Sequence, residues 1–400
     1  MSHYSVIECF FKQLCLKGSP QSSEPFKPVF LTGVGILFPT PLMILKAMDF
    51  TKYKDDFTTE ATKKGLSNRN IQHCLAYAGV LFSHNVPIIY NPSHLSELVG
   101  YKKEYLKKAA LHTSYFYRDF EITKKNGKKR PISEPLPSLK EIQIWILKNI
   151  LENVPVSPFA KAYKPKTRLI ENLKFHKNQP KVFTLDLENF FPSIKIEAVE
   201  KVFQELGYSK MVSNLLVKLC TRDNALPQGA PTSPYLSNLI FNEADAIISD
   251  FCKKEKIRYT RYADDLSFSG DFDENGLLDK VTDTIENLNL HINKSKTKLM
   301  TPNTRQTVTG IVVNDKPQVV FHKRNELRQV MYYIKKFGFE EHRVYKEINQ
   351  ANYLEHLLGK INFVLQINPK DAEFMEYKAF LIDLKKKQDE KIKNPLPLLV

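Results

Sequence analysis

Two adjacent aspartates, Asp264 and Asp265, interrupt the segment RYTRYADDLSFSG (258–270), which otherwise reads as a β-strand. Aspartate is depleted in strands, and neighbouring like charges repel each other. A third aspartate, Asp186, stands at the end of the apolar segment VFTLDL, where burial penalises an unpaired carboxylate. Enzymes of nucleotidyl and phosphoryl transfer use clustered carboxylates to hold two Mg²⁺ ions about 3.5–4 Å apart. A lone aspartate on a strand is more often a turn residue, but the three together predict such a metal site.

The elements that position these carboxylates are strands of a sheet. VFTLDL (182–187) predicts one strand, and the segment around the paired aspartates predicts a hairpin. A second hairpin is expected where 118–122 and 130–135 alternate around the basic turn KKNGKK, and a third at 307–314 and 317–322. Helical spacing is present at 138–154, at 196–220 with a break at Gly207, near 276–288 and from about 323 onward. Residues 93–112 predict two short helices with Ser93 as N-cap and a break at Gly100. Strands and helices alternate irregularly, which favours an α+β class with an antiparallel sheet.

The charge balance points to a polyanionic partner. The 400 residues include 59 Lys and Arg against 44 Asp and Glu, a formal net charge of +15. Such an excess is typical of proteins that bind nucleic acid, although a basic surface can also serve solubility alone.

The five cysteines form no CxxC pair, which argues against a zinc site or a disulfide framework and favours a reducing, cytoplasmic compartment. Neither a signal peptide nor a membrane span is indicated, so we expect a soluble protein without a membrane partner.

The motifs around the three aspartates resemble those of reverse transcriptases. TRYADD is similar to the catalytic motif of that family, and FTLDLENFFPSI resembles its first metal-binding motif. The resemblance implies Asp186, Asp264 and Asp265 as catalytic residues and ligands of two Mg²⁺ ions. It also implies the carbonyl group of Leu187 as a backbone ligand.

The resemblance also implies contacts to the dNTP substrate. Phe191 stands where the family places an aromatic side chain against the sugar 2′ position; a core aromatic is the alternative. ALPQGAPTSP resembles the motif whose Gln-Gly pair, here Gln228 and Gly229, packs against the incoming nucleotide. Lys296 in INKSKTKL matches a lysine near the triphosphate, and Arg130 in GKKRPISEP matches a fingers residue that can grip phosphate bidentately. For Lys296 a solvated position is the competing interpretation.

Two further signatures resemble bacterial retron reverse transcriptases. VTG, which is Val308, Thr309 and Gly310, matches a tripeptide of that group. NLKFH, from Asn172 to His176, partly matches an Asn-Ala-x-x-His motif. The resemblance implies RNA contacts at these positions, although His176 could instead be a hydrogen-bonded polar side chain beside a basic loop.

Two basic stretches predict an RNA-binding surface. Residues 161–181 combine cations with aromatic side chains, a mixture that suits RNA backbone and bases, and the helix that begins near residue 323 carries further cations. The candidate cationic contacts are Lys164, Lys166, Arg168, Lys323, Arg324 and Arg328.

The resemblance implies a right-hand polymerase fold with four parts. These are an N-terminal extension (1–92) without an assigned role, fingers (93–180), a palm (181–315) with a fingers insertion near 195–230, and a thumb with C-terminal tail (316–400). Retron enzymes copy a cognate structured non-coding RNA into single-stranded DNA from a 2′-hydroxyl of that RNA, commonly in anti-phage defence with an effector protein.

Three alternatives remain open at this point. The first is a defence-associated reverse transcriptase that makes no branched product, for which the extra N-terminal segment leaves room. The second is an RNA-binding scaffold without catalysis, against which the three intact aspartates argue. The third is an RNA-dependent RNA polymerase, against which Phe191 and the Tyr-Ala pair before Asp264 argue.

Overall fold

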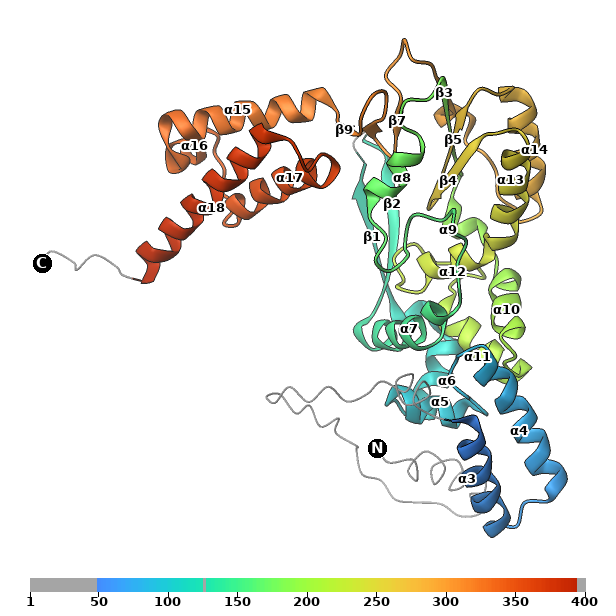
Figure 1. Ribbon diagram of the computed structural model, residues 1–400. Helices are drawn as coiled ribbons and strands as arrows, with labels where there is room; N and C mark the ends of the chain where they lie inside the picture. The colour runs from blue at the N-terminus through green and yellow to red at the C-terminus, as the bar shows by residue number, and fades with distance from the viewer. Residues whose placement is uncertain (1–48, 125–126, 394–400) are drawn as a thin grey trace, which may run out of the picture. The chain divides into compact units, whose positions relative to one another are not determined.

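The computed structural model describes residues 49–124 and 127–393 (Figure 1). Residues 1–48 of the predicted extension, the turn residues 125–126 and the tail 394–400 lie outside the described part. The chain divides into two compact units: Met1–Pro158 with Leu187–Ile247 and Thr282–His291, and Phe159–Asp186 with Ile248–Val281 and Ile292–Val400. Each unit therefore combines segments that are distant in sequence, and the unit limits do not follow the four predicted parts.

The first unit is mainly helical and carries one β-hairpin. Its elements are α3 (Phe50–Lys63), α4 (Asn68–Ser83), α5 (Pro92–Val99), α6 (Lys103–Leu111), η1 (Thr113–Phe116), β1 (Tyr117–Thr123), β2 (Lys129–Pro135), α7 (Pro137–Asn149), η2 (Leu151–Asn153), α9 (Phe190–Ser193), α10 (Ile196–Glu205), α11 (Lys210–Cys220) and α12 (Ser233–Ile240). Two further helices, α13 (Asn242–Lys254) and α14 (Glu274–Glu286), pass from one unit to the other.

Local sequence signals account for most of these elements. The predicted hairpin is present, with β1 and β2 antiparallel from Tyr117↔Pro135 to Thr123↔Lys129. The break between α5 and α6 lies at Gly100 as expected, with φ of 74°. The predicted N-cap Ser93 is wrong, because Asn91 caps α5 by accepting a hydrogen bond from the His94 amide and Pro92 occupies the first turn.

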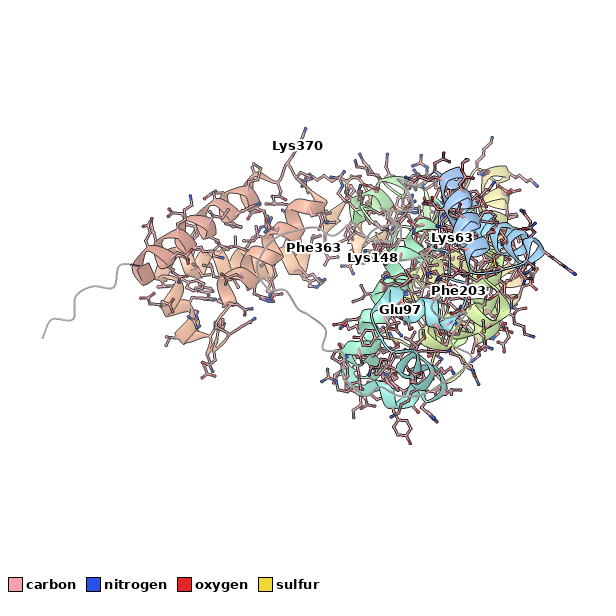
Figure 2. All side chains as sticks on the ribbon, turned by 90° about the horizontal axis from the view of Figure 1, so that it is seen from below. Lys63, Glu97, Lys148, Phe203, Phe363 and Lys370 are labelled. Carbon is pink, nitrogen blue, oxygen red and sulfur yellow. The ribbon has the colours of Figure 1, made fainter. Side chains whose placement is uncertain are left out.

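The described part of the predicted extension contacts the segment that connects α10 and α11 of the same unit. The Tyr208 hydroxyl donates to the Pro87 carbonyl at 2.9 Å, and a His84 ring nitrogen lies 3.0 Å from the Leu206 carbonyl oxygen. The side chains of Tyr208 and Phe203 are buried, and the position of Phe203 can be followed in Figure 2. Residues 49–92 are therefore part of the first unit's core.

The second unit is built on a four-stranded antiparallel sheet with the order β4-β5-β3-β6 (Figure 1). Its strands and short helices are α8 (Leu169–Phe175), β3 (Lys181–Asp186), β4 (Arg258–Tyr262), β5 (Asp265–Gly270), η3 (Lys294–Lys296), β6 (Lys298–Met300), β7 (Thr307–Val308), β8 (Ile311–Val312) and β9 (Gln318–Val319). The register pairs Leu185 with Leu266 and Phe183 with Phe268, and all four side chains are buried. An apolar pair of central strands therefore anchors the sheet.

The C-terminal part of this unit is helical, as expected. It contains α15 (Phe321–Phe337), α16 (Phe339–Tyr345), α17 (Tyr353–Ile367) and α18 (Ala372–Lys393). Buried residues of these helices, such as Leu327 and Leu357, form one apolar core with Val182 of β3 and Val308 of β7. The third predicted hairpin is present only in part: β8 and β9 form it, whereas the predicted strand 307–314 turns back after Val308 and is divided into β7 and β8. The last strand ends at Val319 because α15 begins at Phe321. No helix in the described ranges is long and apolar enough to cross a membrane.

Candidate active site in the four-stranded sheet

Strand register brings the predicted catalytic carboxylates together. Asp186 is the last residue of β3, Asp265 is the first residue of β5, and the two are direct partners in the antiparallel ladder. Asp264 lies in the two-residue turn between β4 and β5, beside Ala263, whose φ of 59° is unusual for a residue other than glycine. Two neighbouring strands and one tight turn therefore place the three aspartates at one edge of the sheet.

The electrostatics of the site confirm that these carboxylates influence one another. Burial first, and the negative charges of Asp264 and Asp186 next, raise the pKa of Asp265 to about 6, while the positive charge of Lys296 opposes the shift. The Lys296 ammonium nitrogen lies 2.9 Å and 2.8 Å from the two carboxylate oxygens of Asp186. The site thus concentrates negative charge and already holds one cationic group.

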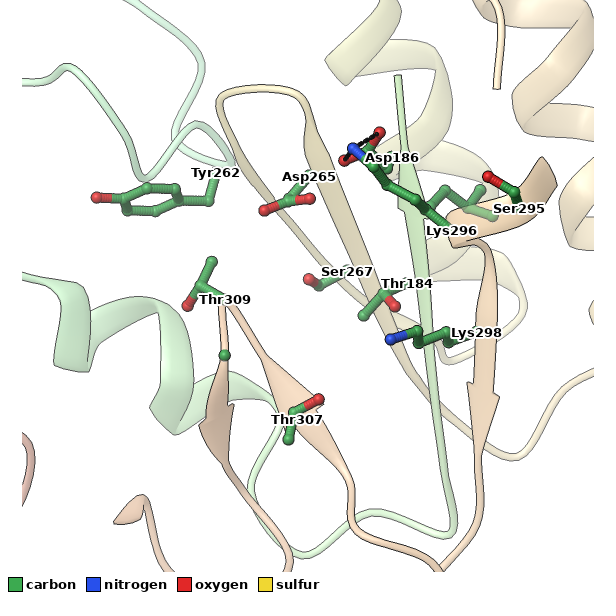
Figure 3. A pocket seen from close by; sticks show the side chains of 12 residues that line it. Thr184, Asp186, Tyr262, Asp265, Ser267, Ser295, Lys296, Lys298, Thr307 and Thr309 are labelled. Atoms are coloured by element: carbon green, nitrogen blue, oxygen red, sulfur yellow. Dashed lines mark hydrogen bonds and ion pairs between the residues drawn. The ribbon is translucent and has the colours of Figure 1, made fainter. Parts of the chain in front are cut away.

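Two of the three carboxylates, Asp186 and Asp265, line an open pocket of about 500 Å³ (Figure 3). All of its lining residues belong to the second unit. They are Thr184, Leu185, Asp186, Tyr262, Asp265, Ser267, Ser295, Lys296, Lys298, Thr307, Thr309 and Gly310. The sheet strands contribute polar side chains such as Thr184 and Ser267 to the pocket, and its two lining lysines, Lys296 and Lys298, add positive charge.

The donor set suits hard divalent cations. Mg²⁺ prefers carboxylate oxygens, and the Asp186 carboxylate binds a cationic group with both oxygens through Lys296. Within the described ranges, no three His, Cys, Asp or Glu side chains are already converged as a closed metal cage. Asp186, Asp264 and Asp265 would therefore hold metal ions only after Lys296 releases Asp186. Leu187, whose carbonyl group is the predicted backbone ligand, directly follows Asp186 and has a buried side chain.

Part of the retron-like tripeptide lies at the pocket. Thr309 and Gly310 line it, and both have positive φ, 46° and 76°. The Thr309 hydroxyl is buried without a hydrogen-bond partner. Val308, in contrast, is fully buried in the apolar core, so its side chain cannot contact RNA here. The predicted RNA contact is therefore corrected for Val308, while Thr309 and Gly310 face the carboxylate pocket.

The structure does not support direct RNA contacts for Asn172 and His176, because both side chains are fully buried. One ring nitrogen of His176, Nε2, lies 2.7 Å from the Thr260 hydroxyl, and Nδ1 lies 2.8 Å from the Ser269 hydroxyl. The Thr260 hydroxyl in turn donates to the Asn172 side-chain carbonyl at 2.5 Å. These residues connect α8 to β4 and β5, and the contacts of His176 agree with the alternative of a hydrogen-bonded polar side chain.

The predicted cationic contacts differ in their exposure. Arg324 is buried, pairs with Asp371 at 2.6 Å and faces the Phe374 ring, so its predicted RNA contact is also corrected. Arg328 is partly exposed and binds Glu373. The remaining candidates all have exposed side chains, and Arg168 also pairs with Glu171; they are Lys164, Lys166, Arg168 and Lys323.

Four predicted nucleotide contacts belong to the first unit, and their roles stay predictions. Arg130 is exposed on β2, Phe191 lies on α9 beside Phe190, and Gln228 and Gly229 precede α12. The Gln228 carbonyl accepts a hydrogen bond from the backbone of β2.

Several pocket residues were not identified from the sequence. Thr184 and Ser267 are register partners, and each lies two residues from a predicted catalytic aspartate on its strand. Side chains two residues apart on a strand share a face, so this period of two could have identified both. Tyr262 and Thr307 carry no comparable local signal.

The chain is similar to known reverse transcriptases over most of its length. The family model described as reverse transcriptase (RNA-dependent DNA polymerase) matches residues 122–333. Retron Ec86 reverse transcriptase of Escherichia coli is 30% identical over 316 residues, 78% of this chain and 93% of that protein. Retron Ec83 reverse transcriptase of Escherichia coli is 32% identical over 278 residues, covering 66% and 86%. Retron Mx65 reverse transcriptase of Myxococcus xanthus is 27% identical over 333 residues, covering 76% and 75%. The sheet-borne carboxylates and these matches together show that the chain belongs to the reverse transcriptase family, as a retron-type RNA-directed DNA polymerase.

Proposed function

We propose that this enzyme copies part of a cognate structured non-coding RNA into single-stranded DNA, starting from a 2′-hydroxyl of that RNA. The polymerase part of the proposal rests on the placement of Asp186 opposite Asp265 at the edge of a buried sheet. The choice of template and primer rests on the similarity to proteins named retron reverse transcriptases. The net charge of +15 suits an RNA partner and a DNA product.

Two Mg²⁺ ions are the proposed cofactors, and dNTPs are the proposed substrates. Bound ions of this kind activate the attacking hydroxyl and neutralise the departing pyrophosphate. Asp186, Asp264 and Asp265 would hold them through carboxylate oxygens. Lys296 is within reach of Asp186 and has a 55% exposed side chain, so it is free to turn from the carboxylate toward a phosphate group.

The proposed substrate contacts follow the family resemblance. Arg130 would bind the triphosphate, Phe191 would exclude a ribose 2′-hydroxyl, and Gln228 with Gly229 would pack against the incoming nucleotide. The exposed cations at 164–168 and Lys323 would contact the RNA. We further propose a role in anti-phage defence together with an effector protein.

Primer extension by the purified protein tests the polymerase proposal. With a primed RNA template and Mg²⁺, we expect incorporation of dNTPs and not of rNTPs. Asp264→Asn should abolish synthesis, whereas Asp271→Asn is the matched control, because Asp271 is an exposed aspartate that follows the opposite end of β5. Incorporation of neither nucleotide, or an equal loss in both variants, would contradict the proposed chemistry.

Sequencing of the nucleic acid that copurifies with the protein tests the choice of template and primer. A retron-type product should keep ribonucleotides at its 5′ end after RNase digestion, since it is joined to the RNA through a branch. DNA without this junction would favour a defence-associated enzyme that copies a non-coding RNA without branching. RNA alone, together with inactive protein, would favour the non-catalytic scaffold.

A further inference from the structure

We propose that Asp119 and Arg222 are positioning residues for the loop 221–232 between α11 and α12, which contains Gln228 and Gly229. They hold this loop against the β1–β2 hairpin and so set the affinity for the incoming dNTP. This inference rests on the proposed role of Gln228 and Gly229 in nucleotide binding. All four residues belong to the first unit.

The loop begins with a tight turn that fixes the direction of Arg222. Arg222 and Ala225 form an antiparallel bridge, with hydrogen bonds of 2.9 Å and 3.0 Å between their backbone groups. The two residues between them, Asp223 and Asn224, both have positive φ, 51° and 57°. Asn and Asp tolerate this conformation better than other residues besides glycine, which makes the turn a property of the local sequence.

A forked ion pair attaches this turn to the hairpin. Arg222 donates to both carboxylate oxygens of Asp119, at 2.5 Å from Nη1 and 2.8 Å from Nη2. The Arg222 side chain is only 14% exposed, and its guanidinium group lies over the Tyr117 ring at 5.3 Å. A planar guanidinium fixed by a carboxylate and an aromatic face has little freedom to turn. The start of the loop is therefore attached to β1.

The end of the loop is attached to β2 through the register partner of Asp119. Ser133 lies directly opposite Asp119 in the ladder, and its hydroxyl donates to Asp119 Oδ1 at 2.8 Å. The Ser133 backbone amide donates to the Gln228 carbonyl at 2.9 Å. A Cβ added to Gly229 would lie 2.6 Å from the Ser133 carbonyl oxygen, so the two backbones are in close contact.

These contacts link Arg222 to Asp119, Asp119 to Ser133 and Ser133 to Gln228. The backbone between Gln228 and Arg222 closes the ring. Its two attachments lie on either side of the tight turn, so loss of the ion pair would leave the loop held at one end only. A loop that samples several positions binds the nucleotide less tightly, since part of the binding free energy is used to order it. The carboxylates that carry the chemistry are on other strands, so catalysis by bound substrate should change little.

Steady-state primer extension with a single varied dNTP tests this inference. Asp119→Asn keeps the shape of the side chain but removes its charge, and it should raise the KM for dNTP about three- to tenfold while kcat stays within about twofold, as expected for one partly exposed forked pair. Arg222→Lys should have a similar effect, because lysine cannot form the fork. The exchanged pair Asp119→Arg with Arg222→Asp should recover part of the affinity.

Glu134→Gln is the matched control. Glu134 and Arg118 are register partners one position away on the same hairpin, and they form an ion pair of 2.7 Å that does not involve the loop. A melting temperature equal to that of the unaltered enzyme will show that the variants fold. An unchanged KM in Asp119→Asn, an equal rise in Glu134→Gln, or a fall in kcat at constant KM would overturn the inference. Failure of the unaltered enzyme to incorporate dNTPs would instead refute the proposed function.

Discussion

Replacement of His176 by alanine separates a structural role from an RNA-binding role. Thr260 donates its hydroxyl proton to Asn172, so the same oxygen accepts from His176 Nε2, and Nδ1 then accepts from the Ser269 hydroxyl. The imidazole is thus neutral and carries its proton on Nε2. His176→Ala removes the acceptor of the buried Ser269 hydroxyl and the donor to the Thr260 hydroxyl oxygen, and it creates a cavity, which should lower the free energy of unfolding by about 2–4 kcal/mol at neutral pH.

The pH dependence follows from the burial of the ring. Burial first and the nearby positive charge of Arg258 second lower the pKa of His176 to about 3. Because the unfolded chain has the ordinary value near 6.5, it takes up the proton first as the pH falls, and this favours unfolding. The contribution of the neutral ring to the free energy of unfolding is complete above pH 6.5 and is lost as the pH falls toward 3. At pH 5 this loss amounts to about 2 kcal/mol. The destabilisation caused by His176→Ala should therefore shrink by about this amount between pH 7.5 and pH 5.

Urea denaturation at the two pH values, combined with RNA binding by the folded proteins, measures both properties. Lys164→Ala serves as the complementary variant, because Lys164 is exposed and lies in the predicted RNA-binding stretch. We expect His176→Ala to lose stability and keep RNA affinity, and Lys164→Ala to lose affinity and keep stability. A His176→Ala protein that unfolds like the unaltered enzyme but binds RNA weakly would refute this reasoning.

Three further predictions concern other parts of the enzyme. Asp264→Asn should abolish DNA synthesis with unchanged melting temperature and RNA affinity, as measured by primer extension and filter binding; loss of folding would mean that the aspartate is structural. Gly229→Ala places a Cβ 2.6 Å from the Ser133 carbonyl oxygen and should raise the KM for dNTP about tenfold or more in the same assay, since small displacements of positioning groups are costly. Arg324→Met leaves Asp371 buried without its partner and should lower the free energy of unfolding by about 3–5 kcal/mol in urea, whereas unchanged stability would indicate that Asp371 finds another partner.

Sequence alone predicted the elements whose signals are local. The hairpin of β1 and β2 follows from alternation around a basic Asn-Gly turn, and the breaks at Gly100 and Gly207 follow from glycines with positive φ. The three aspartates were predicted as catalytic residues because charge is unfavourable on a strand unless a function requires it. Ser93 was chosen as N-cap because it is a good capping residue, but Asn91 before Pro92 is a stronger combination.

Burial and partner choice could not be predicted in the same way. His176 and Arg324 are polar residues in basic stretches, and nothing next to them in sequence shows that they are buried. Their partners, such as Thr260, Ser269 and Asp371, are distant along the chain and are selected by the tertiary fold. A cation in a basic stretch is therefore weak support for RNA contact until its exposure is known.

The same distinction explains why the three aspartates are better support for function than the basic residues. A buried arginine or histidine can be stabilised by groups that the fold supplies, and Asp371 does so for Arg324. The Asp186–Asp265 pair has no such arrangement, because the ladder places two acids opposite each other, and burial together with the charges of Asp264 and Asp186 raises the pKa of Asp265. Lys296 compensates only Asp186 by direct contact, from an exposed and movable side chain. Carboxylates held together in this way destabilise the fold unless cations are supplied from outside, so the register that creates the repulsion is best explained by metal-dependent chemistry at this edge of the sheet.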